Sequence, residues 1–88
     1  MSRAEIRKKF IDIIQDVCPD TDLSRLDDRI PITDQIRLTS LDFLDLWLLL
    51  RQRFNVSVSE SEISNFGTVE SAVAYIELKL QQPGQGIK

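Results

Sequence analysis

Residues 38–54 read LTSLDFLDLWLLLRQRF, and this stretch decides the fold because a helix start precedes a wide apolar stripe. Apolar side chains recur at i, i+3, i+4, i+7 and i+11, which is the period of one helix face. The stripe consists of Phe43, Leu46, Trp47, Leu50 and Phe54. Thr39 precedes Asp42 by three residues, an arrangement typical of a capping box, so Thr39 is the expected N-cap. The pattern predicts a helix over about residues 40–54 with this stripe against a core.

A second leucine row lies on another side of the same helix. Leu41, Leu44 and Leu48 follow one another at i, i+3 and i+7, and they cannot all point into the core that the first stripe faces. Asp42 and Asp45 flank this row, which we name the leucine strip. A small bundle cannot surround one helix completely, so we expect the strip to be exposed and to contact partner proteins. The alternative is that a long loop covers it.

The N-terminal segment predicts another helix, over about residues 4–17. One face carries apolar side chains at helical spacing, namely Ile6, Phe10, Ile13, Ile14 and Val17. Ser2 is a suitable N-cap, and Pro19 stops the helix shortly after Cys18.

Two helices are expected toward the C-terminus. The stretch SESEISNF predicts a short helix at about residues 60–65, capped by Ser59 and closed by Gly67. The last helix, over about residues 69–80, begins after Thr68 as its cap. Its buried stripe consists of Val69, Ala72, Val73, Ile76 and Leu80.

The connection over residues 19–39 is long and polar, and Pro31 breaks any helix that runs into it. A disordered linker would hold fewer apolar residues, so we expect an ordered loop with a short helical turn near residues 33–36. Its apolar anchors are Leu23, Leu26, Ile30, Ile32, Ile36 and Leu38. The sequence thus predicts an all-α fold, a small four-helix bundle with three longer helices and one short helix, over residues 1–82. Residues 83–88 are expected to form a disordered tail.

Composition excludes several functions. The chain has 88 residues, 14 acidic and 11 basic, and its net charge of −3 disfavours nucleic acids and anionic membranes as partners. No apolar run approaches the ~20 residues of a membrane span, and the N-terminus does not resemble a signal peptide. A cytoplasmic monomer is the expectation.

The sequence contains one cysteine and no histidine, which leaves no intrachain disulfide, no histidine-ligated metal and no catalytic constellation. We therefore expect neither an enzyme nor a metal site.

Ser40 follows the expected cap directly, so its side chain should face solvent at the mouth of the long loop. Helix N-termini present unpaired N–H groups and positive partial charge, which suit a phosphate or phosphodiester. Serine is also an ordinary residue at a helix start, and on physical grounds alone that simpler role is the commoner one.

The layout resembles the acyl carrier protein family, in which an Asp-Ser-Leu motif carries 4′-phosphopantetheine on its serine. The resemblance rests on Ser40-Leu41-Asp42 in an acidic, leucine-rich helix, on the long first loop and on Thr68-Val69 opening the last helix. It covers about residues 4–80. It implies that Ser40 is the attachment site for 4′-phosphopantetheine. It also implies that one helix face meets partner enzymes, through Leu41, Asp42, Leu44, Asp45 and Leu48.

Two departures distinguish this chain from the pattern of the family. Thr39 stands where the family has an aspartate next to the serine, and Arg37 stands where it has a glycine. Residues 51–53 read Arg-Gln-Arg where the family often has an acidic cluster. A partner that docks through a basic surface would meet positive charge there. These departures favour a specialised carrier over the housekeeping carrier of fatty acid synthesis.

The resemblance implies a carrier that holds an acyl group as a thioester on the arm and presents it to other enzymes. Its expected partners are a phosphopantetheinyl transferase and the enzymes that load and remove the acyl group. Two alternatives stay open, a carrier of an aminoacyl or other non-fatty cargo and an unmodified helical interaction module. In the resembling family an acyl chain can fold between the helices. Phe43 and Trp47 on the inward stripe are expected to fill or reshape that space here.

Overall fold

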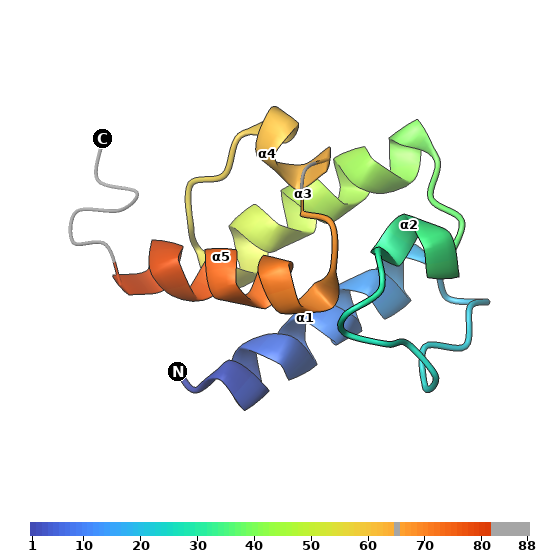
Figure 1. The fold of residues 1–88 in the computed structure, drawn as a ribbon. Coiled ribbons are helices and arrows are strands. Elements are labelled where there is room, and N and C mark those ends of the chain that lie inside the picture. The colour runs from blue at the N-terminus through green and yellow to red at the C-terminus, as the bar shows by residue number, and fades with distance from the viewer. Residues whose placement is uncertain (65, 82–88) are drawn as a thin grey trace.

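The computed structural model describes residues 1–64 and 66–81, which form helices joined by ordered loops (Figure 1). The helices of these residues are α1 Arg3–Val17, α2 Ile32–Gln35, α3 Ser40–Phe54, α4 Glu60–Ser64 and α5 Val69–Gln81. α1 packs against α3 and α5, and α3 packs against α4. The prediction of an all-α bundle with three longer helices is confirmed, and α2 is the short helical turn expected in the loop. The prediction of a disordered tail falls on residues outside the described part of the chain.

The helices begin at the residues that the sequence marks. Ser2 Oγ accepts a hydrogen bond from the Glu5 N–H at 3.2 Å, and Glu5 Oε1 accepts one from the Ser2 N–H at 2.8 Å. Thr68 Oγ1 likewise accepts from the Ser71 N–H at 3.0 Å. At the other end of α3, Asn55 adopts φ 55°, a left-handed conformation that asparagine tolerates and that ends a helix. Local side-chain bonds therefore fix the helix bounds.

The core lies where α1, α3 and α5 meet. The buried side chains include those of Ile6, Phe10, Ile13, Leu50, Val69 and Ile76. Val56 and Val58 are also buried, although the segment between α3 and α4 has no regular secondary structure and is too short to show a period. Leu80 was expected on the buried stripe of α5, but it is 37% exposed because the last turn of α5 extends past the core.

Side-chain hydrogen bonds hold the long loop against the bundle. Arg7 on α1 donates two hydrogen bonds to the Asp28 carboxylate, at 2.7 and 2.8 Å. The backbone carbonyl of Asp28 accepts from the Glu70 N–H at 3.0 Å, and the Ile32 N–H donates to the Gly67 carbonyl at 2.8 Å. The loop is thus ordered, as predicted. Most of its apolar anchors are buried or half-buried, and Ile30, at 43% exposed, is the exception.

Figure 1 shows how this loop positions the start of α3. α2 and the loop close the end of the bundle at which α1 ends and α3 begins. The chain leaves α2 at Ile36, which is buried, and reaches Ser40 three residues after the exposed Arg37. The N-terminus of α3 is therefore presented at one end of the molecule.

Candidate functional site

Ser40 is the first residue of α3, and its side chain is exposed. The N–H groups at the start of a helix have no acceptor within the helix, and the helix dipole adds positive partial charge there. Of these N–H groups, the Thr39 side chain accepts a hydrogen bond only from that of Asp42. The distance between Thr39 Oγ1 and the Asp42 nitrogen is 3.1 Å. A phosphodiester on the Ser40 oxygen would therefore be accessible to an enzyme and would lie in a favourable electrostatic environment.

The cap next to Ser40 has the geometry that the sequence predicts. Thr39 and Asp42 form a complete capping box, because the Thr39 N–H also donates to Asp42 Oδ2 at 2.9 Å. The carboxylate of Asp42 is therefore turned back toward the cap and is half-buried. Asp45, one turn further on, is exposed. Of the two acidic residues expected to contact partners, Asp45 is the one whose carboxylate lies on the open surface.

The leucine strip lies on the exposed side of α3. Leu41 is 72% exposed and Leu48 is 41% exposed, while Leu44 between them is half-buried. The long loop therefore does not cover the strip, which answers the alternative that the sequence left open. Together with Asp45, these leucines place an apolar surface with an acidic margin directly beside Ser40.

Two arginines change the charge of α3 at its C-terminal end. Arg53 donates a hydrogen bond to the carboxylate of Asp16 and so connects α3 to α1. The guanidinium of Arg51 lies 5.1 Å from the centroid of the Trp47 ring, within the range of a cation–π contact. Arg51 is exposed, and the helix period places it in the same row as Leu44 and Leu48. The exposed face of α3 is thus acidic near Ser40 and basic at its far end.

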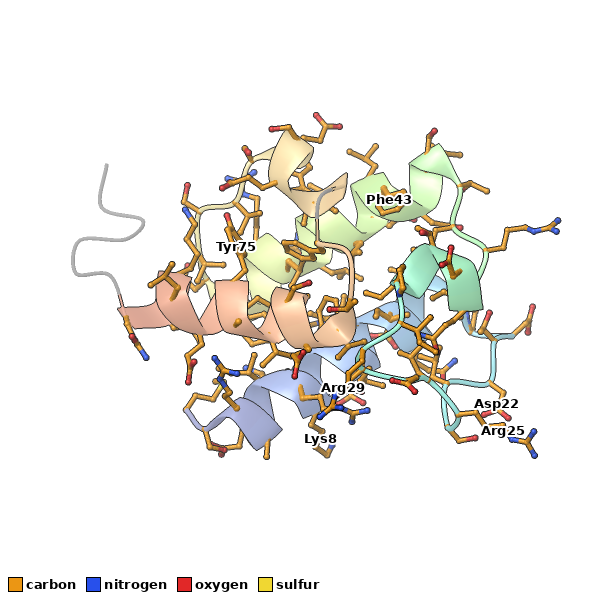
Figure 2. The ribbon with its side chains drawn as sticks, viewed as in Figure 1. Lys8, Asp22, Arg25, Arg29, Phe43 and Tyr75 are labelled. Atoms are coloured by element: carbon orange, nitrogen blue, oxygen red, sulfur yellow. The ribbon has the colours of Figure 1, made fainter. Side chains whose placement is uncertain are left out.

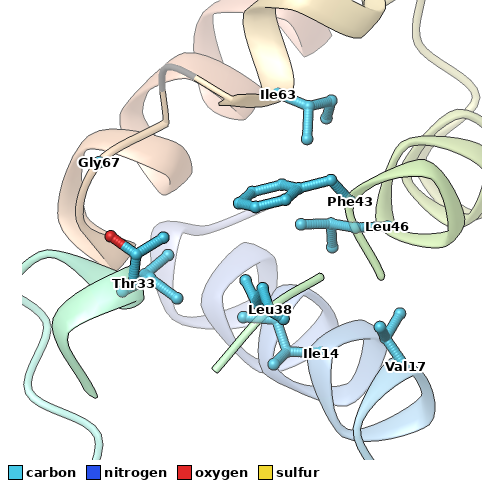
Figure 3. Close-up of a pocket in the computed structure, with 9 residues that line it drawn as sticks. Ile14, Val17, Thr33, Leu38, Phe43, Leu46, Ile63 and Gly67 are labelled. Carbon is cyan, nitrogen blue, oxygen red and sulfur yellow. The ribbon is translucent and has the colours of Figure 1, made fainter. Parts of the chain in front are cut away.

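An apolar cavity of about 60 Å³ lies behind the start of α3 (Figure 3). Its walls come from four helices and the loops beside them, and they include Ile14, Leu38, Phe43, Leu46 and Ile63. Phe43, labelled near the start of α3 in Figure 2, was expected on the inward side and does line the cavity. Ile63 and Leu38 were not assigned to a pocket from the sequence, because only the folded chain brings α4 and the loop to α3.

Trp47 does not line this cavity, contrary to the expectation that both aromatic residues would fill it. Its indole N–H instead donates to the backbone carbonyl of Val58 at 2.5 Å. A tryptophan N–H that is withdrawn from water needs an acceptor, and the segment between α3 and α4 supplies one here. Of the two aromatic residues, only Phe43 lines the space near Ser40.

Cys18 follows the last residue of α1 as its C-cap, and its free thiol group belongs to a half-buried residue. Burial, together with the negative charge of Asp42, raises the pKa of this thiol. A thiol with a raised pKa forms little thiolate and reacts slowly.

Within residues 1–64 and 66–81 there is no group of acidic, cysteine or histidine side chains placed to hold a metal ion. No helix of that part of the chain has the length and apolarity to cross a membrane.

Comparison with known proteins agrees with this geometry. Residues 8–76 match the family model for the phosphopantetheine attachment site. A protein of Thermotoga maritima named acyl carrier protein is 33% identical over 79 residues, which cover 90% of this chain and 96% of the relative. An acyl carrier protein of Phytoplasma australiense is 47% identical over 47 residues, which cover 53% of this chain and 62% of that protein. An acyl carrier protein of Chlorobium luteolum is 30% identical over 79 residues, covering 90% of this chain and all of the relative.

The fold and these matches define a carrier domain rather than a catalyst. The chain belongs to the acyl carrier protein family, whose cofactor is 4′-phosphopantetheine. The resemblance inferred from Ser40-Leu41-Asp42 and the helix layout is thereby confirmed at the level of the family.

Proposed function

We propose that Ser40 carries the 4′-phosphopantetheine arm and that the protein presents an acyl group, held as a thioester, to partner enzymes. The observation that supports this proposal is the position of Ser40, an exposed hydroxyl at the first residue of α3 within the matched attachment domain. The arm supplies a thiol, and the protein itself contributes an accessible attachment point and a surface that partners can recognise.

The surface that we propose for those partners is the leucine strip with its two acidic neighbours, Asp42 and Asp45. Leu41 and Leu48 expose apolar area within three turns of Ser40, as a transient docking surface requires. The phosphopantetheinyl transferase and the enzymes that load and remove the acyl group would bind in turn to the same face of α3. Arg51 at the far end favours partners with a carboxylate at that position.

An acyl cargo is favoured over an aminoacyl cargo by the cavity beside Ser40. The described residues that line it include one side-chain hydroxyl, that of Thr33, and no charged group. An ammonium group buried there would have no ionic partner, whereas an acyl chain would replace water with apolar contacts.

The test is loading of the purified protein with a promiscuous phosphopantetheinyl transferase and butyryl-coenzyme A. Intact mass should increase by one butyryl-phosphopantetheine, and hydroxylamine should then remove only the butyryl group. A thiol reagent should afterwards label the arm quickly and Cys18 slowly, since burial and Asp42 raise the pKa of Cys18. A mass that never increases with several transferases would instead favour the unmodified interaction module.

A further inference from the structure

The charges on the outer face of α3 are arranged evenly about Leu48. Asp45 lies three residues before Leu48 and Arg51 lies three residues after it, and all three residues are exposed. Within residues 1–64 and 66–81, neither Asp45 nor Arg51 forms an ion pair. This face therefore offers a second molecule one negative and one positive charge, equally far from Leu48.

Two copies of α3 that pack antiparallel, with Leu48 at the centre of the contact, match these charges. A residue before Leu48 in one copy then lies level with the residue equally far after Leu48 in the other copy, because every residue adds the same rise along a helix. Asp45 of each copy is thus level with Arg51 of the other. The helix period places the two charges on opposite flanks of Leu48, so the long arginine side chain spans the contact to reach the carboxylate. A parallel pair would instead bring like charges to the same level.

We propose that this face of α3 binds a second copy of the chain in a weak, reversible dimer with two-fold symmetry, centred on Leu48. Self-pairing goes beyond the proposed function, since it requires no arm on Ser40. α3 has 15 residues and is therefore about 22 Å long, so a contact of one such helix from each copy falls short of the ~1,200 Å² of a stable interface. The net charge of −3 on each chain adds repulsion. The chain should therefore be a monomer at low concentration and pair only at high concentration.

The dimer and a partner enzyme would use the same surface. Pairing covers Leu48 and the charges beside it, so a bound second copy excludes the enzymes proposed for the leucine strip. Ser40 is level with Val56 of the other copy, past the last residue of that copy's α3, and so lies outside the contact between the two helices. At high concentration the chain would thus limit its own docking while its proposed attachment point stays accessible.

Sedimentation velocity of the unmodified chain, from about 10 µM to about 1 mM, measures the association. Asp45→Arg sets arginine against arginine and Arg51→Asp sets aspartate against aspartate, so each variant alone should associate at least about tenfold more weakly. An equimolar mixture of the two variants should recover the association of the unaltered chain, because both charge pairs are then opposite again. Asp12→Arg is the matched control, because it makes the same change in charge as Asp45→Arg at an exposed position of α1, and it should associate like the unaltered chain. Circular dichroism confirms that each variant is folded.

Crosslinking tests the register of the two helices independently of the charges. In a Cys18→Ser background, which removes the one native thiol, Leu48→Cys and Leu41→Cys are each treated with a short bismaleimide. Random collisions would favour Leu41→Cys, since Leu41 is 72% exposed and Leu48 is 41% exposed. The proposed register favours Leu48→Cys, because Leu48 faces its own copy, and the covalent dimer should form at least about fivefold faster there than at Leu41→Cys.

A chain that stays monomeric up to about 1 mM would overturn the inference and leave partner enzymes as the occupants of the leucine strip. So would a mixture of Asp45→Arg and Arg51→Asp that associates no better than each variant alone, or faster crosslinking of Leu41→Cys. None of these measurements involves modification of Ser40, so a failure here is distinguishable from a failure of the proposed function.

Discussion

At the scale of single residues, the site depends on two adjacent hydroxyls with different tasks. Thr39 caps α3 through its bond with the Asp42 N–H, while Ser40 directs its hydroxyl to solvent. The division follows from position, because the N-cap side chain folds back over the first turn and the next side chain does not. Thr39 therefore matters for stability and Ser40 for chemistry.

Removal of the Thr39 cap should lower the stability of the folded protein but leave the proposed attachment point, Ser40, in place. Thr39→Ala should lower the free energy of unfolding by about 1 kcal/mol, since the Asp42 N–H loses its acceptor. Thr39→Asp should retain most of that stability, because aspartate caps a helix as well as threonine and adds negative charge at the N-terminus. Urea denaturation of the three proteins measures the difference. Equal stability of Thr39→Ala and the unaltered protein would show that the cap contributes nothing.

At the scale of elements, α3 presents one face to the core and another to solvent. Truncation of a leucine to alanine should therefore lower the free energy of unfolding by different amounts on the two faces. Leu46→Ala and Leu50→Ala should each cost about 2–5 kcal/mol, because both side chains are buried. Leu48→Ala should cost less than about 1 kcal/mol, since Leu48 is 41% exposed on the outer face of α3. Denaturant melts that give similar losses at all three positions would mean that α3 is covered on every side.

The bounds and the buried face of α3 could be predicted because the residues that determine them lie close together in the sequence. The apolar period, the Thr39–Asp42 cap and the left-handed Asn55 all lie within one stretch of chain. Trp47 and Phe43 share the same stripe, yet only Phe43 lines the cavity. Their different environments depend on what other segments supply, a carbonyl from Val58 and the side chain of Ile63, and no periodicity in the sequence reports that.

The same reason explains what the sequence left open in the candidate site. The position of Ser40 at a helix start followed from the cap and the stripe. The shape of the cavity behind it did not, because its walls come from residues as distant in sequence as Ile14 and Gly67. The role of Asp42 was only partly foreseen, since the hydrogen bond that turns its carboxylate back toward the Thr39 N–H competes with a contact to a partner.

At the scale of the whole molecule, the long loop is connected to the bundle by the ion pair of Arg7 and Asp28. The hydrogen bonds from Arg7 lower the pKa of Asp28 below its usual range. A carboxylate whose folded pKa is depressed stabilises the protein above its unfolded pKa, and this stabilisation is lost as the pH falls through the folded pKa. The contribution of the pair should therefore be present at neutral pH and should disappear in acid.

Asp28→Asn tests this dependence. Both partners are more than a third exposed, so solvent screening keeps the expected loss at pH 7 below about 1 kcal/mol. The difference from the unaltered protein should begin to shrink below about pH 4, the ordinary pKa of an aspartate in the unfolded chain, and should disappear as the pH falls through the lower pKa of folded Asp28. Asp12→Asn is the matched control, because the Lys8–Asp12 pair lies on the surface of α1 alone and should contribute little at any pH. A loss at Asp28→Asn that stays constant from pH 7 to pH 3 would contradict the assignment.

The account as a whole depends on the hydroxyl of Ser40, and site mapping after modification tests it most directly. The unaltered protein and Ser40→Ala are incubated with a phosphopantetheinyl transferase and coenzyme A, and intact mass and peptide fragmentation are recorded for both. We predict one added phosphopantetheine in the unaltered protein, located on the peptide that contains Ser40, and none in Ser40→Ala. The variant should remain folded, because Thr39 and Asp42 still cap α3. A phosphopantetheine that persists in Ser40→Ala, or that maps to another residue, would contradict the central claim.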